Sequence, residues 1–357
     1  MHLDHGTVPD AYQAYIGRKI GLILLLAVVL AAALLLAVSL GAARLPIADV
    51  ARALVGAETS RQVEAIVWNI RLPQALAAMA SGAGLAVAGA VMQSILRNPL
   101  GSPFTLGISH AAAFGAALSV MLLGSGTMSS TSVGAVSITN PYLTTGSAFV
   151  FSLLAAALII AIARLRGATP EIMVLTGVAL GALFTAGTMF LQFFADDVQL
   201  AAMVFWTFGD TARGSWPELL FIAVVLAGCS VYFLLNCWNY NAIDTGDETA
   251  KGLGVRVDRL RLLGMLLASL LTAVIIAFLG IIGFIGLIVP HLVRRFIGSD
   301  HRFLLPASLL VGALLLLLSD TMARLILMPH VLPVSVLTAF LGAPAFFWLI
   351  IRRSNHR

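Results

Sequence analysis

The chain is dominated by long apolar runs that are separated by short polar segments. Eight runs have about 20 residues each and hardly any charge, which is enough for a helix to cross the roughly 30 Å hydrocarbon core of a bilayer. They are residues 20–40, 74–96, 104–124, 143–163, 171–194, 217–236, 303–319 and 333–351. The pattern predicts an all-α membrane protein whose residues 1–357 form a single transmembrane domain.

Residues 262–290 form a further apolar stretch. Its 29 uncharged residues are too many for one upright helix and few for two full ones, and Gly280, Gly283 and Gly286 interrupt its middle. Cytoplasmic loops collect Lys and Arg. If this stretch forms two helices, the whole chain has 15 Lys and Arg residues on the cytoplasmic side and 6 on the outer side. If it forms one helix, the counts are 10 on the cytoplasmic side and 11 on the outer side. We therefore predict ten transmembrane helices with both termini in the cytoplasm.

The composition excludes several other classes of protein. Hydrophobic residues make up 60% of the chain and charged residues 10%, against about 45–50% and about 25% in soluble domains. Such a chain is not a soluble enzyme, a disordered protein or a nucleic-acid-binding module, even with a net charge of +5. The 2 cysteines, Cys229 and Cys237, lie in or beside one apolar run, so neither a disulfide framework nor a metal site is expected.

The polar segments between the runs predict some structure outside the membrane. The first run is longer than the core of a signal peptide, which has about 7–15 residues, so it is expected to be a retained span behind a cytoplasmic tail of residues 1–19. Residues 47–54 and 198–208 predict short outer helices, and residues 125–141 an outer linker. The one long inner loop, residues 237–261, predicts two very short helices joined by a turn at Gly252–Gly254. No Walker motif occurs, so the chain cannot hydrolyse ATP by itself.

Two spans carry a regular pattern of small or polar residues. Gly82, Ala86 and Ala90 recur every four residues and predict close packing against a neighbouring helix. In the run 171–194, one helical face carries Gly181, Thr185, Thr188 and Gln192. Polar side chains in a span face a bundle interior or a water-filled cavity. This stripe therefore predicts either the lining of a translocation path or hydrogen bonding between helices.

A series of short motifs then indicates a family. They are residues 70–73 (IRLP), 89–93 (GAVMQ), 97–100 (RNPL), 177–181 (GVALG), 248–255 (ETAKGLGV), 283–291 (GFIGLIVPH), 300–302 (DHR), 320–324 (DTMAR) and 341–344 (LGAP). In order and spacing, from about residue 18 to residue 353, the chain resembles the permeases of bacterial binding-protein-dependent ABC importers for iron–siderophores, haem and vitamin B12.

The resemblance implies the fold of the B12 permease and a location in the bacterial cytoplasmic (inner) membrane. The expected partners are a second copy of the chain, two ATPase subunits that bind ATP and Mg, and a periplasmic or lipid-anchored substrate-binding protein. Membrane lipid surrounds the chain, no nucleic acid is expected, and no cofactor is expected on the chain itself.

The resemblance also assigns roles to residues. The ATPase-coupling segment corresponds to Glu248, Ala250, Gly252, Leu253, Gly254 and Val255. Arg71 and Arg324, at the outer mouth, correspond to arginines that pair with acidic residues of the binding protein; contact with lipid headgroups is the alternative. The family places the span with Gly181, Thr185, Thr188 and Gln192 along the translocation path.

A gate at the inner mouth is a further expectation. Thr169 and Glu171 lie where the B12 permease narrows, but here a proline and an acid replace two small hydroxyl residues. The alternative is helix capping, with Thr169 as the N-cap and Glu171 at the positive end of the helix dipole.

The expected function is import of an iron chelate, with ferric siderophore as the first expectation and haem or cobalamin as alternatives. A secondary transporter without an ATPase is the alternative from another class. Ion-coupled carriers keep ionisable residues deep within their spans, whereas Glu171, Glu218, Asp320 and Arg324 all lie near span ends. The sequence therefore favours an ABC importer.

Overall fold

The computed structural model describes residues 10–41, 43–124, 126–128, 136–138, 141–328 and 330–354. These residues are helical except for short connections and one antiparallel pair of strands, β1 (Gly126–Met128) and β2 (Val136–Ile138). The strands lie in the segment predicted as a linker, so that prediction was wrong. Residues 1–9 of the predicted tail lie outside the described residues, and α1 already begins at Asp10, so residues 10–19 are helix rather than tail.

Every predicted apolar run contains one helix, and the stretch 262–290 contains two. In chain order they are α1 (Asp10–Ser39), α4 (Leu72–Ile95), α5 (Ile108–Leu123), α6 (Pro141–Arg166), α7 (Pro170–Phe194), α9 (Trp216–Leu235), α12 (Val257–Leu279), α13 (Ile285–Ile297), α14 (His301–Ile326) and α15 (Val334–Ser354). Within the described residues, 7 helices are long and apolar enough to cross a membrane by length and composition. These are α1, α6, α7, α9, α12, α14 and the continuous helix Arg61–Ile95 that contains α4.

The helical structure is interrupted between α12 and α13, as the three glycines predicted. Gly280 follows α12 with φ of 77°, in the left-handed region that glycine adopts without steric cost. A Cβ atom there would lie 2.8 Å from the carbonyl oxygen of Phe208, which leaves no room for a side chain. The two-helix interpretation of residues 262–290 is confirmed, although α13 has only 13 residues.

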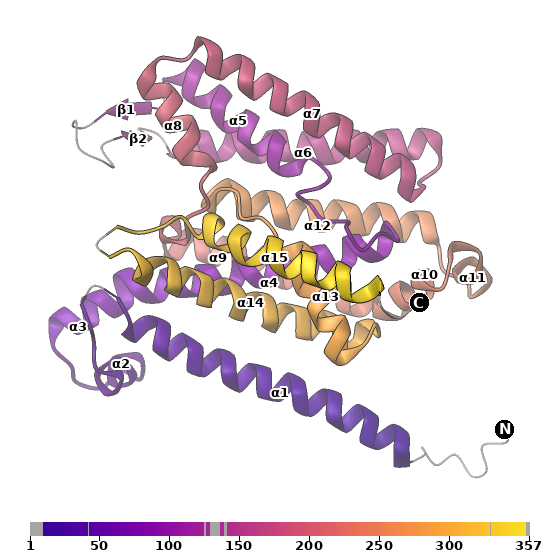
Figure 1. Cartoon of the computed structure of the whole chain (residues 1–357), viewed down its shortest axis with the longest axis horizontal. Helices are drawn as coiled ribbons and strands as arrows, with labels where there is room; N and C mark the ends of the chain where they lie inside the picture. The colour runs from indigo at the N-terminus through magenta and orange to yellow at the C-terminus, as the bar shows by residue number, and fades with distance from the viewer. Residues whose placement is uncertain are drawn as a thin grey trace.

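Helix α4 lies at the centre of the molecule, where it packs against α9, α12, α13 and α14 (Figure 1). Helices α5, α6 and α7 form a separate layer, and α12 joins that layer to α4 by packing against α6 as well (Figure 1). The small-residue stripe of α4 makes the contact with α14, because Gly82 and Ala86 both face Gly312. The packing prediction for these residues is confirmed.

The short elements gather at the two ends of the bundle (Figure 1). One end, called here the α2 end, holds α2 (Ile47–Leu54), α3 (Arg61–Ile66), α8 (Asp197–Thr207) and the two strands. The helices predicted for residues 47–54 and 198–208 are thus confirmed. The opposite end, called the α11 end, holds α10 (Cys237–Asp244) and α11 (Asp247–Gly252).

Candidate functional site

The candidate site is the segment α10–α11, which joins α9 to α12. The two predicted short helices are present, but their joint is different from the predicted one. Helices α10 and α11 meet at Thr245–Gly246, with Gly246 at φ of 127°. The turn at Gly252–Gly254 instead leads from α11 into α12, with Gly254 at φ of 83°. The predicted position of the glycine turn between the short helices is therefore wrong.

The tip of α11 presents an apolar side chain to solvent. Leu253 is 70% exposed, and a Cβ atom at Gly252 would have no neighbour within 4 Å. Glu248 and Lys251 flank this tip and form an exposed ion pair at 3.1 Å. Ala250, by contrast, is fully buried on the opposite face. The segment thus has one face packed on the bundle and one free face with a leucine at its centre.

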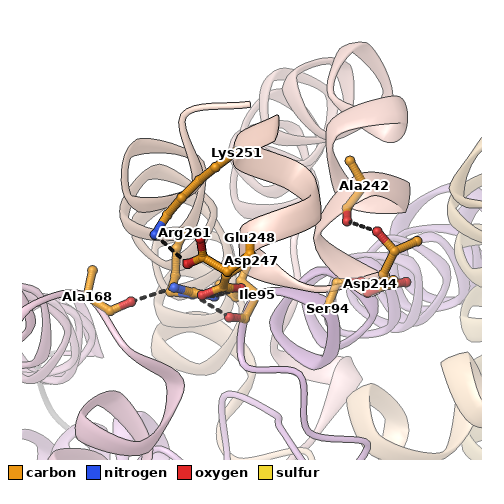
Figure 2. A network of polar contacts seen from close by, with 10 residues as sticks. Ser94, Ile95, Ala168, Ala242, Asp244, Asp247, Glu248, Lys251 and Arg261 are labelled. Carbon is orange, nitrogen blue, oxygen red and sulfur yellow. Dashed lines mark hydrogen bonds and ion pairs between the residues drawn. The ribbon is translucent and has the colours of Figure 1, made fainter. Parts of the chain in front are cut away.

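Arg261, in the first turns of α12, holds the packed face of α11 to two other parts of the chain (Figure 2). Its Nη2 donates to both carboxylate oxygens of Asp247, at 2.9 and 3.1 Å. Its Nε donates to the carbonyl oxygen of Ile95 at 2.7 Å, at the end of α4. Its Nη1 donates to the carbonyl oxygen of Ala168 at 2.7 Å, in the loop between α6 and α7. Arg261 is 1% exposed, so these partners compensate a charge that water cannot reach.

A second polar cluster fixes the end of α10 to α4 and α14. Asp244 accepts hydrogen bonds from Ser94 Oγ at 2.5 Å and lies 3.0 Å from His301 Nε2. Ser94 Oγ is also 2.8 Å from His301 Nε2. Burial opposes ionisation of Asp244, but the contacts with His301 and Ser94 outweigh it and hold the pKa of its carboxyl below the ordinary value.

The N-terminus of α14 is tied to α10 as well. Asp300 caps α14 by accepting from the backbone N–H of Arg302 at 3.0 Å, and it also accepts from the side chain of Asn241 at 3.0 Å. The Arg302 guanidinium forms an ion pair with Asp300 at 2.6 Å. Burial raises the pKa of Asp300, but these hydrogen bonds prevail and lower it to about 2.

The predicted gate residues occupy the start of α7. Thr169 is the N-cap, and its hydroxyl accepts from the N–H of Ile172 at 3.5 Å. Pro170 takes the first position and Glu171 is exposed in the first turn, at the positive end of the helix dipole. The capping interpretation is confirmed for Thr169, and the gate role stays a prediction.

The polar stripe of α7 begins against the start of α5, and its hydroxyls bond within α7 itself. Gly181 is buried beside the Cα atom of Gly107, and the hydroxyls of Thr185 and Thr188 donate to carbonyl oxygens one turn earlier in α7, each at 2.8 Å. Gln192 lies on the same side of the helix and is partly buried. The exposed face of α7 is apolar instead; it includes Leu175, Val178, Leu183, Met189, Phe190 and Phe193. A path-lining role for the stripe stays a prediction.

Arg71 and Arg324 both have partners inside the chain. Arg71 is 6% exposed, and its guanidinium donates to the carbonyl oxygens of Val38 at 2.8 Å, Ser39 at 2.9 Å and Ala43. Arg324 forms an ion pair at 3.0 Å with the buried carboxylate of Asp320. Arg71 is thus almost fully buried, whereas the side chain of Arg324 keeps 11% of its surface exposed. The docking role stays a prediction, while these contacts support a structural role.

Sequence reasoning missed the central residue of the site. Arg261 and Asp247 both lie in the inner loop predicted for residues 237–261, and in the structure they pair across 14 residues. The available signal was the position of Arg261, the last of three arginines at the start of a long apolar helix and the one nearest its apolar part, where burial demands an acidic partner. Among the residues that the structure describes, no group of three or more His, Cys, Asp or Glu side chains could hold a metal ion.

Comparison with known proteins connects this geometry to transport. Residues 26–352 match the model of the FecCD transport family. A protein of Methanocaldococcus jannaschii named as an ABC transporter permease is 52% identical over 97% of this chain and 98% of its own length. The hemin transport system permease of Yersinia pestis is 39% identical over 82% of this chain and 85% of its own.

A solved structure agrees with these matches. An inward-facing transporter described as being of the metal-chelate ABC type superposes with a TM-score of 0.81, at 32% identity, over 93% of this chain and 99% of that one. Other relatives are named for the import of ferric citrate, molybdate or vitamin B12. The chain therefore belongs to the FecCD transport family and is a multi-pass permease subunit of an ABC importer, not its ATPase.

Proposed function

We propose that this permease moves an iron chelate, most readily a ferric siderophore, from the periplasm to the cytoplasm. Two copies of the chain enclose the translocation path, and each spans the membrane ten times with both termini inside. Two ATPase subunits dock at the α11 end, and a substrate-binding protein docks at the α2 end.

The exposed tip of α11 is the observation that carries this proposal. Leu253 stands on a short helix that is anchored to α4 and α12 through Asp247 and Arg261, so a push on the leucine is delivered to the bundle. An exposed leucine between two glycines is suited to a small apolar hollow on a partner surface, because removing its apolar surface from water is favourable. Basic residues also gather at the α11 end, among them Arg256, Arg259, Arg294 and Arg302, as expected of the cytoplasmic side.

The substrate proposal rests on the relatives and on the expected chemistry of import. Relatives at 33–39% identity are named for hemin, ferric citrate, molybdate and vitamin B12, so identity at this level does not select one cargo. Two of these four are iron compounds, which supports an iron chelate. Haem is the second candidate, because the hemin permease is among the more similar relatives.

Transport by the complete importer in lipid vesicles tests the proposal. The vesicles would contain ATP and would be offered, one at a time, a labelled ferric siderophore, haem, cobalamin and molybdate together with the binding protein. We expect uptake of the ferric siderophore that requires ATP. Uptake of haem, cobalamin or molybdate alone would replace the proposed cargo, and uptake without ATP or the ATPase would contradict the mechanism.

A further inference from the structure

The α6–α7 loop and the coupling segment are far apart in sequence, but one side chain joins them. Arg261 uses three different nitrogen atoms for three different partners: Asp247 of α11, Ile95 of α4 and Ala168 of the α6–α7 loop (Figure 2). The planar guanidinium holds its donors in a fixed fork. Displacing one partner must therefore rotate the guanidinium group or break one of its other hydrogen bonds.

Burial makes breaking these bonds unfavourable. Arg261 is 1% exposed and Ala168 is 7% exposed, so neither the guanidinium nor the carbonyl group can readily exchange its partner for water. Asp247 is the more accessible member, with 28% of its side chain exposed. A displacement of α11 is therefore expected to carry Arg261 and the Ala168 carbonyl with it.

The α6–α7 loop is restrained more on its α7 side than on its α6 side, so a displacement of Ala168 is expected to reach α7. On the α6 side, Gly167 has φ of 82° and no atom lies within 4 Å of the position that a Cβ would take, so no packed side chain holds it in place; its carbonyl oxygen accepts from the N–H of Thr169 on the α7 side. On the α7 side, Ala168 is followed by the N-cap Thr169 and by Pro170, whose ring fixes φ in the first turn. A pull on Ala168 therefore moves the start of α7 more readily than the end of α6.

We propose that Arg261 is a positioning residue that transmits movement of α11 to the start of α7. The inference rests on the proposed coupling role of α11 and adds the route by which its movement reaches a membrane-spanning helix. Arg261 contacts neither the ATPase nor the cargo in this proposal. It acts by holding α11, the end of α4 and the α6–α7 loop together, so that the three segments move as a unit.

Hydrogen exchange read by mass spectrometry tests the route within one chain. The full-length permease, in lipid nanodiscs with the ATPase that co-purifies with it, would be compared with and without ATP plus vanadate. In the wild type we expect changes in exchange at residues 247–254 and also at residues 164–172. In Arg261→Gln, and more mildly in Asp247→Asn, the change at 247–254 should remain and that at 164–172 should be lost.

The variants are chosen to separate transmission from folding. Arg261→Lys keeps the charge but lacks the planar guanidinium whose donors reach three partners, so it should behave like Arg261→Gln. Arg166→Gln removes an exposed arginine beside the same loop and should behave like the wild type. Asp247→Asn leaves both carbonyl contacts of Arg261 in place and keeps the test available if Arg261→Gln does not fold.

The outcomes distinguish the two proposals. No change at residues 247–254 in the wild type would count against ATPase docking at α11, and so against the proposed function. A change there without one at 164–172, or a response at 164–172 that survives in Arg261→Gln and Arg261→Lys, would overturn the role of Arg261. Transport per ATP hydrolysed should fall about tenfold in Arg261→Lys if the route operates.

Discussion

Gly82 of α4 and Gly312 of α14 face each other so closely that a Cβ atom on either one would collide with the carbonyl oxygen of the other. The contact lets the backbones of the two helices approach, which is how helices gain packing energy in a membrane where lipid is as apolar as leucine. It also fixes α14 against the central helix, and α14 begins in the polar cluster that anchors α10.

The substitution Gly82→Ala should therefore destabilise the permease. A methyl group there must push α4 and α14 apart, and such overpacking costs about 1–3 kcal/mol. Gly21→Ala is the matched control, because a Cβ atom at Gly21 meets nothing within 4 Å. Thermal unfolding in detergent micelles should show a lower midpoint for Gly82→Ala only. Equal midpoints in the two variants would contradict the packing described here.

Arg71→Ala should also destabilise the fold rather than affect docking alone. The change removes the side-chain donor from the carbonyl oxygens of Val38, Ser39 and Ala43. Ser39 keeps a bond from the N–H of Leu45, and a buried polar group left unsatisfied costs about 1–3 kcal/mol. The exposed Arg44→Ala serves as the control. If Arg71→Ala melts like the control and still loses stimulation of ATP hydrolysis by the binding protein, the docking role is supported instead.

The orientation in the membrane can be tested with single cysteines, after Cys229 and Cys237 are replaced. Val55 is 80% exposed at the α2 end and Leu253 is 70% exposed at the α11 end. An impermeant thiol reagent applied to intact cells should label Val55→Cys, and it should label Leu253→Cys only after the membrane is opened. Labelling of both residues from outside would be incompatible with the proposed orientation.

Acid should weaken the junction between α10 and α14. The pKa of Asp300 is lowered from 3.8 to about 2 in the folded protein, so its ionised form stabilises the fold above pH 4. That contribution is lost as the pH falls from about 4 to about 2. Asp300→Asn should flatten the dependence of the unfolding midpoint on pH in this range, whereas the exposed Asp258→Asn should not. A variant with unchanged pH dependence would rule out this role of Asp300.

Much of the helical framework could be predicted from the sequence, because apolar runs of membrane length leave few other structures possible. Residues 47–54 and 262–290 show this, since a helical pattern and a cluster of glycines specified one short helix and one break. The site was predicted less completely. Arg261 pairs with Asp247, Ile95 and Ala168 only because of how α4, α6 and α12 pack. The distance between these residues along the sequence does not indicate that they meet.

The polar residues of the spans illustrate the same limit. A hydroxyl on a helix face predicts a polar neighbourhood, but Thr185 and Thr188 satisfy that need with carbonyl oxygens of their own helix. For Arg71 the family resemblance implies docking of the binding protein, and the sequence says nothing of partners inside the chain. In the structure the Arg71 guanidinium donates to carbonyl oxygens at the end of α1, where the last turn of a helix lacks the N–H groups of a following turn.

We propose that α11 converts ATP hydrolysis into transport through the exposed leucine at its tip. The ratio of chelate taken up to ATP hydrolysed, measured in vesicles that contain the complete importer with Leu253→Asp, tests it most directly. Because an aspartate cannot occupy an apolar hollow, we predict that the ratio falls at least about tenfold while the ATPase keeps hydrolysing. Leu165→Asp, an equally severe change at an 83% exposed leucine of α6, should leave the ratio unchanged. A wild-type ratio in Leu253→Asp would contradict the coupling role of Leu253.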